Sequence, residues 1–354
     1  MTMMSVSARP VTGGVDTHKD AHVAAIVDHL GGVLETASFV NDARGYPLLL
    51  TWMRGHGSLE RVGVEGTGSY GAGLARFLRR EHVVVVEVNR PSRVVRRMAG
   101  KSDIVDAIEA ARAALSGRAS GAPKAGDGIV EAIRLLRTAR RSAVQSRTQC
   151  ANQIHALVDT GPESLRARCA NQKLATIIEL APQLVIGAEL TEPETCAPWT
   201  LRSLAARWLF LDDQIAELDG HLDRLVALAA PGLLAHFGVG TDTAGALLVA
   251  AGDNPDRLHN EAAFAALCGV APLPASSGRT TRHRLNRGGN RDANQALWRI
   301  AMVRMAHDPT TRAYVIKRTE QGLSKREIIR VLKRYIARQL FPHLAHLAAS
   351  PRTS

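Results

Sequence analysis

The sequence predicts an α/β domain, then a helical middle, then a mainly α-helical C-terminal part. Three observations predict this order: short β-branched runs alternate with helical patterns up to about residue 120, a leucine-rich heptad pattern follows, and longer helical patterns fill the end. A chain of 354 residues is long enough for two or three cores. We expect domains at 10–120, 127–230 and 231–345.

The first part of the chain justifies the α/β assignment. Apolar runs at 14–28 and 33–40, joined by Gly31-Gly32, predict a β-hairpin. A helical pattern follows from Tyr46 to Met53, and RVGVE at 61–65 predicts a short strand. The β-branched run at 82–88 is typical of a strand buried on both faces of a sheet.

The middle of the chain predicts two long helices. Residues 116–128, SGRASGAPKAGDG, read as a linker. The helix expected at 129–158 is basic, with Arg134, Arg137, Arg140, Arg141 and Arg147. The next carries a heptad seam at Leu201, Leu204, Trp208, Leu211, Ile215, Leu218, Leu222 and Leu225. The seam predicts a coiled coil and a homo-oligomer, either a dimer or a tetramer. A helical hairpin that buries the same stripe inside one protomer explains the pattern equally well.

The C-terminal part combines glycine turns with basic segments. Helical runs around Gly238-Val239-Gly240 resemble a helix-hairpin-helix, whose backbone amides commonly hold a phosphate, although such turns also occur without a ligand. Residues 279–291, RTTRHRLNRGGNR, are too rich in arginine to face a dry core. We expect an apolar helix at 293–306 and a basic helix at 325–340.

Composition narrows the class of partner. Lys+Arg 45 against Asp+Glu 33 gives a formal charge of +12, which favours a polyanion such as nucleic acid. The four cysteines form no CxxC pair, so zinc and disulfide frameworks are excluded. The chain has no long apolar run and no secretory signal pattern, so we expect a cytoplasmic protein without a membrane partner.

Four carboxylates are placed to meet at one sheet edge. Asp16 follows the apolar start of one predicted strand, and Glu65 ends a second. Asp103 and Asp106 begin a helix after the third strand. Four such groups would repel one another unless a cation were present. Paired Mg²⁺ ions are the usual remedy in phosphodiester chemistry. Each acid taken alone is more simply a solvated or capping residue, and the combination is what predicts a metal site.

These acids lie in blocks that resemble a known family. GVDTHKD at 14–20, VEGTGSYG at 64–71 and NRPSRVVRRMAGKSDIVDAIEAARAAL at 89–115 are similar to the signature blocks of the DEDD-type insertion-sequence transposases. The C-terminal blocks GVGTDTAGALLVAAGD at 238–253 and FAALCGVAPLPASSGRTTRHRLNRGGNRDANQALWRIA at 264–301 resemble the transposase domain of the same family. Five blocks in order cover most of the chain.

The resemblance implies a RuvC-like N-terminal domain with an RNase H fold, in which Asp16, Glu65, Asp103 and Asp106 are the D, E, D and D positions. It implies a DNA recombinase that works on donor and target DNA with a structured guide RNA from the same element. It also implies a catalytic serine within ASSG at 275–278, where we favour Ser277 and keep Ser276 as the alternative. Thr17-His18 and the Gly- and Ala-rich linker depart from the family pattern, and we expect neither to touch the site.

The arginine-rich segment beside that serine gains a role from the resemblance. Its arginines are expected to clamp the nucleic-acid backbone rather than to be merely solvated: Arg279, Arg282, Arg284, Arg287 and Arg291. Two other functions compete with the recombinase, namely a RuvC-like nuclease that uses water and an inactive nucleic-acid-binding relative. All four acids and the serine are retained, which favours the enzyme.

Overall fold

The computed structural model describes residues 9–88, 102–254, 257–274, 283–284, 286 and 288–345. The chain forms two compact units: unit 1 comprises 1–130, 250–294 and 326–354, and unit 2 comprises 131–249 and 295–325. The domain bounds expected from sequence stay a prediction. No helix among the described residues is both long enough and apolar enough to cross a membrane.

Unit 1 contains a five-stranded mixed sheet with strand order β3-β2-β1-β4-β5. The strands are β1 (Pro10–Thr17), β2 (Ala21–Asp28), β3 (Val33–Val40), β4 (Ser58–Glu65) and β5 (Val84–Val88). β1 pairs antiparallel with β2 and parallel with β4. The predicted hairpin is confirmed for β2 and β3. The run at 14–28 was expected to be one strand, but it turns back after Thr17 and forms two.

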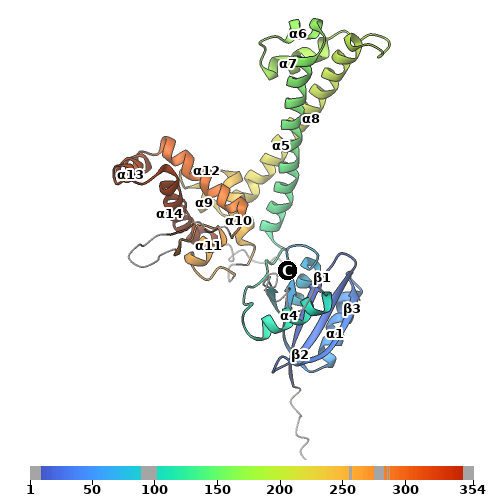
Figure 1. Ribbon diagram of the computed structural model, residues 1–354, viewed down its shortest axis with the longest axis vertical. Helices are drawn as coiled ribbons and strands as arrows, with labels where there is room; N and C mark the ends of the chain where they lie inside the picture. The colour runs from blue at the N-terminus through green and yellow to red at the C-terminus, as the bar shows by residue number, and fades with distance from the viewer. Residues whose placement is uncertain are drawn as a thin grey trace, which may run out of the picture. The chain divides into compact units, whose positions relative to one another are not determined.

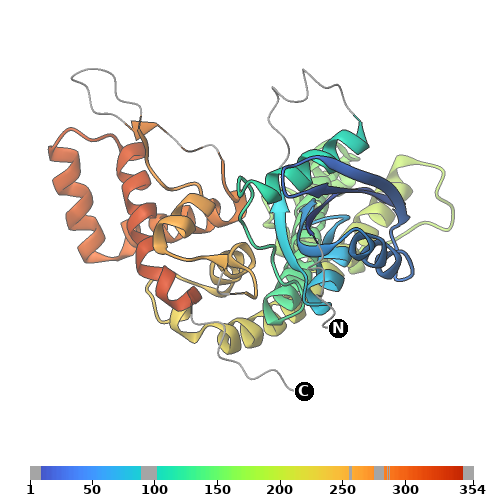
Figure 2. The same ribbon diagram turned by 90° about the horizontal axis from the view of Figure 1, so that it is seen from below.

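Helices cover both faces of this sheet (Figure 2). α1 (Gly45–Gly55) and α2 (Ala72–Arg80) lie on one face, and α4 (Asp103–Leu115) lies on the other. Successive residues of a strand point to opposite faces. Accordingly, a Cβ at Gly13 would meet Met53 of α1, whereas one at Gly14 would meet the backbone of α4. The core between the sheet and α1 and α2 includes Val15, Ile26, Leu49, Met53, Val62 and Leu74.

The expectation that the run at 82–88 is buried on both faces holds only in part. Val85, Val86 and Val88 are buried, but Val84 is 58% exposed, because β5 is the last strand of the sheet. Beyond it, the predicted linker packs on unit 1: Gly121 forms an isolated antiparallel bridge with Glu87, and Ala125 is buried. Backbone pairing therefore anchors this segment despite its composition.

The rest of unit 1 is mainly helical. It contains α11 (Glu261–Leu267), β6 (Leu273–Pro274), β7 (His283–Arg284) and α14 (Lys325–Ala345). β6 and β7 pair antiparallel. Phe264 of α11 packs near Phe341 of α14, and the buried Lys333 donates to Asn294 Oδ1 over 2.9 Å. α14 confirms the basic helix expected at 325–340.

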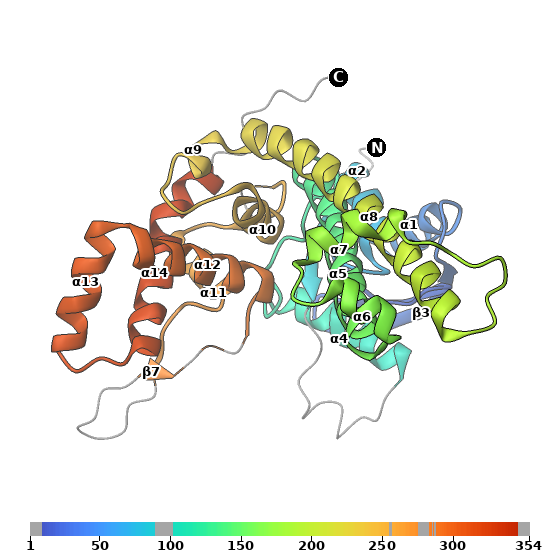
Figure 3. The ribbon, with the colours of Figure 1, turned by 90° about the horizontal axis from the view of Figure 1, so that it is seen from above.

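Unit 2 is built on two long helices that run side by side, α5 (Ile129–Thr160) and α8 (Pro193–Ala229) (Figure 1). α6 (Glu163–Cys169), α7 (Leu174–Leu180) and the 3-10 turn η1 (Ala181–Gln183) close one end of the pair (Figure 3). Leu211 and Ile215 of the heptad seam pack on Ala143 of α5. Four of the eight seam positions, Leu201, Leu211, Ile215 and Leu222, are buried within one chain, which favours the hairpin alternative, and a homo-oligomer stays a prediction.

Ion pairs join the long helices of unit 2. Arg140 pairs with Asp219, and Arg147 pairs with Asp212 and lies over the Trp208 ring. Arginines on α5 that make the sequence basic therefore serve contacts within the chain.

Four further helices of the described chain, shorter than α5 and α8, lie wholly or mostly in unit 2. They are α9 (Pro231–Leu234), α10 (Thr241–Ala251), α12 (Arg291–His307) and α13 (Pro309–Glu320), and α12 packs against the predicted glycine turn. Gly238 has φ of +79°, so the turn between α9 and α10 uses a conformation that L side chains rarely adopt. The first helix of the expected helix-hairpin-helix is only four residues long. α12 confirms the helix expected at 293–306.

Candidate active site

Asp16 lies at the carboxyl end of β1, at the centre of the sheet. Asp16 is only 7% exposed to solvent. Burial raises the pKa of this carboxyl, and the neighbouring His18 opposes the rise with its charge and a hydrogen bond. The charges of Asp106 and Asp103 raise the pKa further. An anionic Asp16 therefore needs a positive group nearby.

Close packing of α4 brings two more acids to this strand end. A Cβ at Gly14 of β1 would overlap the backbone of Ala107 and Ala111, and one at Gly63 of β4 would overlap the carbonyl of Ala110. The inner face of α4 is lined by small buried residues: Ala107, Ala110, Ala111 and Ala114. Because both surfaces lack side-chain bulk, the helix lies directly on the strands. Its first turn, with Asp103 and Asp106, is thereby placed beside Asp16.

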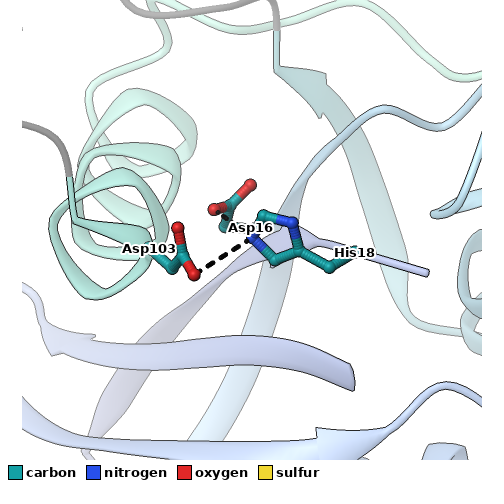
Figure 4. A group of neighbouring side chains, drawn as sticks. All are labelled: Asp16, His18 and Asp103. Atoms are coloured by element: carbon teal, nitrogen blue, oxygen red, sulfur yellow. Dashed lines mark hydrogen bonds and ion pairs between the residues drawn. The ribbon is translucent and has the colours of Figure 1, made fainter. Parts of the chain in front are cut away.

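His18 completes a group of three side chains (Figure 4). Its Nε2 lies 3.0 Å from Asp16 Oδ2 and 3.4 Å from Asp103 Oδ2. One donor atom from each of Asp16, His18 and Asp103 lies within 4.8 Å of the others. The His18 and Asp103 side chains are about half exposed, at 46% and 52%, so a ligand can reach the group from solvent.

The other two predicted acids lie at the same edge. Asp106 is buried one turn along α4 from Asp103 and close enough to Asp16 to affect its pKa. Glu65 ends β4, which pairs parallel with β1, and its carbonyl accepts a hydrogen bond from Thr17 Oγ1 over 2.9 Å. The structure thus brings Asp16, Asp103 and Asp106 together and places Glu65 on the neighbouring strand end.

Several predicted site residues fall elsewhere. Five lie outside the described residues: Ser276, Ser277, Arg279, Arg282 and Arg287. Arg284 in β7 and Arg291 at the start of α12 are exposed. Gly238 and Gly240 form the turn before α10, where the Gly240 amide donates to Thr243 Oγ1 over 3.1 Å. That amide is already engaged within the chain.

Two transposase family models match two separate parts of the chain. Residues 13–161 match a transposase family model of the DEDD type, and residues 231–315 match the model of the transposase IS116/IS110/IS902 family. The chain belongs to the IS110 family of transposases. The acids Asp16, Glu65, Asp103 and Asp106 all lie within the first matched region.

Two relatives of this IS110-family chain come from Streptomyces coelicolor. A mini-circle putative transposase for IS117 is 26% identical over 87% of each chain. A 43.6 kDa protein of insertion element IS110 is 32% identical over 40% of this chain and 36% of its own length. The first similarity runs through most of the chain. The family is one of DNA transposases, which are enzymes.

The IS110-family resemblance misled one sequence expectation. Thr17 and His18 were expected to lie clear of the site, but Thr17 hydrogen-bonds the end of β4 and His18 contacts both Asp16 and Asp103. The sequence carries a signal for this, because His18 follows Asp16 by two residues, directly after the end of β1, and an extended chain keeps residues two apart on one face. The family pattern hid it, because it directs attention to carboxylates alone.

The donor atoms at this site fit the divalent cation that a DEDD-type family implies. Carboxylate oxygens and an imidazole nitrogen are all metal ligands. Burial first, and the charges of Asp106 and Asp103 second, raise the pKa of Asp16, and a cation beside these carboxylates would stabilise the ionised form of Asp16. The side chains of Asp16, His18 and Asp103 are therefore suited to hold a divalent cation.

Proposed function

We propose that this chain is a site-specific DNA recombinase of an insertion sequence, which cuts and rejoins strands with metal-binding acids and a serine nucleophile. One observation carries the proposal: in an IS110-family chain, α4 lays Asp103 and Asp106 against Asp16 at the end of β1. The order of the mixed sheet, with α4 on one face, is compatible with an RNase H-like fold, and a RuvC-like assignment is part of the proposal.

The acids have a common role in this proposal. Asp16, Glu65, Asp103 and Asp106 would supply oxygen ligands to a divalent cation, and carboxylates alone predict Mg²⁺. When bound, such an ion neutralises charge on a phosphate and eases deprotonation of the attacking hydroxyl. Half-exposed Asp103 offers its oxygens to solvent and substrate, whereas buried Asp16 and Asp106 lie beneath it.

The serine step keeps the number of phosphodiester bonds unchanged. The Oγ of Ser277, or of Ser276 in the alternative, attacks a DNA phosphorus and forms a phosphoserine ester. The bond from phosphorus to one strand end breaks, and the serine proton ends on the departing oxygen. Because a phosphodiester is exchanged for another, a second strand end can reverse the step without ATP.

Nucleic acid binding belongs to the basic segment around that serine. Donor and target DNA, and a structured guide RNA, would be held through their phosphates by Arg279, Arg282, Arg284, Arg287 and Arg291. The turn at Gly238 and Gly240 is a further proposed phosphate contact. The exposure of Arg284 and Arg291 supports this assignment.

A covalent trapping experiment tests the proposal. Incubation with substrate DNA, the element's RNA and Mg²⁺ is expected to give a protein–DNA adduct that survives denaturation. Asp103→Ala and Ser277→Ala should each lose the adduct and retain nucleic acid binding, with Ser276→Ala as the matched control. Cleavage without any adduct would instead assign a water-using nuclease, and binding without cleavage would assign an inactive relative.

A further inference from the structure

We propose that His18 is itself a metal ligand in this chain, and that the Asp16–His18–Asp103 set binds Mn²⁺ in preference to Mg²⁺. The inference rests on the proposed function, because it requires that the acids hold a divalent cation. It adds a nitrogen ligand that the four-carboxylate pattern does not contain.

The spacing of the donor atoms supports coordination. Metal–ligand bonds of about 2.1–2.2 Å at right angles place neighbouring donors about 3.0–3.1 Å apart. His18 Nε2 lies 3.0 Å from Asp16 Oδ2 and 3.4 Å from Asp103 Oδ2. His18 Nε2 thus already lies near the adjacent-corner separation from each of the two carboxylates, and one donor atom from each residue lies within 4.8 Å of the others, so small side-chain movements would complete one coordination shell (Figure 4).

Hydrogen bonds from the side chain of Asn41 hold the backbone of His18 in place, and no acidic residue takes part in them. Asn41 Nδ2 donates to the carbonyls of His18 and Lys19, over 3.0 and 3.1 Å. Tyr46 in turn donates its hydroxyl to Asn41 Oδ1 over 2.6 Å. These bonds fasten the β1–β2 turn to the segment that leads into α1. Because the backbone that carries His18 is already held in place, less conformational freedom is lost when the side chain binds a metal.

An ion pair is the competing explanation of the same contacts. A protonated His18 would donate to either aspartate and would need no metal. Coordination requires the neutral imidazole with a free Nε2, and that atom is the one that faces both carboxylates. The two states compete for one atom, so a metal that binds there displaces the proton.

The chemistry of the donor set decides which ion is preferred. Mg²⁺ takes oxygen ligands and keeps several waters, whereas imidazole nitrogen favours first-row transition ions. Mn²⁺ accepts carboxylates as readily as Mg²⁺ does and adds affinity for nitrogen. A set of two carboxylates and one imidazole therefore favours Mn²⁺ over Mg²⁺.

Pulsed EPR of the Mn²⁺-loaded full-length protein tests the inference without any activity measurement. Wild type is expected to show hyperfine coupling from a coordinated ¹⁴N, and labelling with [¹⁵N]histidine should change it to the ¹⁵N pattern. His18→Ala should lose the coupling and weaken Mn²⁺ binding by about tenfold or more in calorimetric titration, with a smaller loss for Mg²⁺. His29→Ala, on the exposed β2–β3 turn, is the matched control and should retain both.

The outcomes separate this inference from the proposed function. Mn²⁺ binding that is lost in Asp16→Asn, without nitrogen coupling in wild type, would overturn the role of His18 and leave the metal-binding acids in place. Coupling that persists in His18→Ala would also overturn it. Absence of Asp16-dependent binding of either ion would overturn the metal site as a whole. The labelled wild-type experiment decides the inference even if the His18 variant folds poorly.

Discussion

Burial acts on two titratable residues of the sheet in opposite directions. It raises the pKa of Asp16 in β1 and lowers the pKa of His22 in β2 to about 4, because in both cases the charged form loses hydration. Asp16 has His18 beside it to offset the cost. His22 has no charged partner of opposite sign: the charge of His18 lowers its pKa further, and only the Asn41 side chain opposes the shift.

The His22 shift predicts an acid-sensitive fold. The folded-state pKa of about 4 lies below the unfolded value of 6.5. The contribution of neutral His22 to stability is therefore fully present above pH 6.5 and is lost as the pH falls towards 4, because the unfolded state takes up the proton first. His22→Phe should remove up to about 3 kcal/mol of this loss. Urea unfolding at pH 7 and pH 4 checks it.

A control for this prediction is available two residues before Gly31. His29→Phe, at an exposed position, should leave the pH dependence of unfolding unchanged. An identical pH dependence in wild type and His22→Phe would contradict the assignment of the loss to His22.

At the scale of elements, contact between α4 and two strand glycines positions the site. Neither β1 nor β4 tolerates a Cβ beneath the helix without displacing its backbone. Any such displacement moves Asp103 and Asp106 relative to Asp16, because both lie on the first turn of α4. Packing geometry, and not local helix propensity, therefore sets the distances between the acids.

Gly14→Ala tests this packing. The added methyl group meets α4 backbone, so we expect a loss of about 1–3 kcal/mol in the free energy of unfolding and weaker Mn²⁺ binding. Gly220→Ala is the control, because its new methyl group has nothing within 4 Å and a helix interior favours alanine by about 1 kcal/mol. Chemical unfolding and calorimetry measure both effects. Unchanged metal binding in a folded Gly14→Ala protein would show that α4 does not set the site.

The heptad seam of α8 gives a second prediction at this scale. Leu211 is buried against α5, so Leu211→Asp should destabilise the protein by about 2–4 kcal/mol without changing its mass in light scattering. The adjacent Phe210 is 65% exposed, and Phe210→Asp should leave the free energy of unfolding nearly unchanged. A lower mass with an intact fold in Leu211→Asp would favour the intermolecular coiled coil instead.

For the whole molecule, a net charge of +12 does not translate directly into a nucleic-acid surface. Arg137, Arg140 and Arg147 of α5 pair with aspartates of the same unit. Positive charge that is neutralised inside the fold releases no counterions from DNA. We therefore expect salt-dependent binding to come from the arginines of the proposed basic segment around residue 284.

The salt dependence of DNA binding tests this distinction. Replacing Arg282 and Arg284 together by Ala should reduce the slope of log K against log salt by about 2, because each phosphate contact contributes about 0.9. Arg140→Gln, which removes an arginine paired with Asp219, should change the slope little and lower stability instead. Equal slopes for the double variant and wild type would remove the basic segment from the binding surface. Fluorescence anisotropy between low and moderate salt provides the measurement.

The sequence by itself determined the family and the position of several strands and of the two long helices. Periodicities of two and of three to four residues are local properties, so the strands around Asp16 and Glu65 and the helices at 129–158 and 201–225 were predictable from pattern alone. The resemblance of the signature blocks to the family likewise predicted the four acids. Such predictions need only the residues of the local segment and no knowledge of what the segment packs against.

Tertiary structure decided what each element packs against. The seam of α8 is satisfied by α5 of the same chain, and a heptad pattern does not encode its partner. His18 joins Asp16 and Asp103 because the β1 end and the first turn of α4 come together over Gly14 and Gly63. Asp103 is far from Asp16 and His18 in the chain, so its proximity to them depends on backbone approach distances that a one-dimensional pattern does not contain.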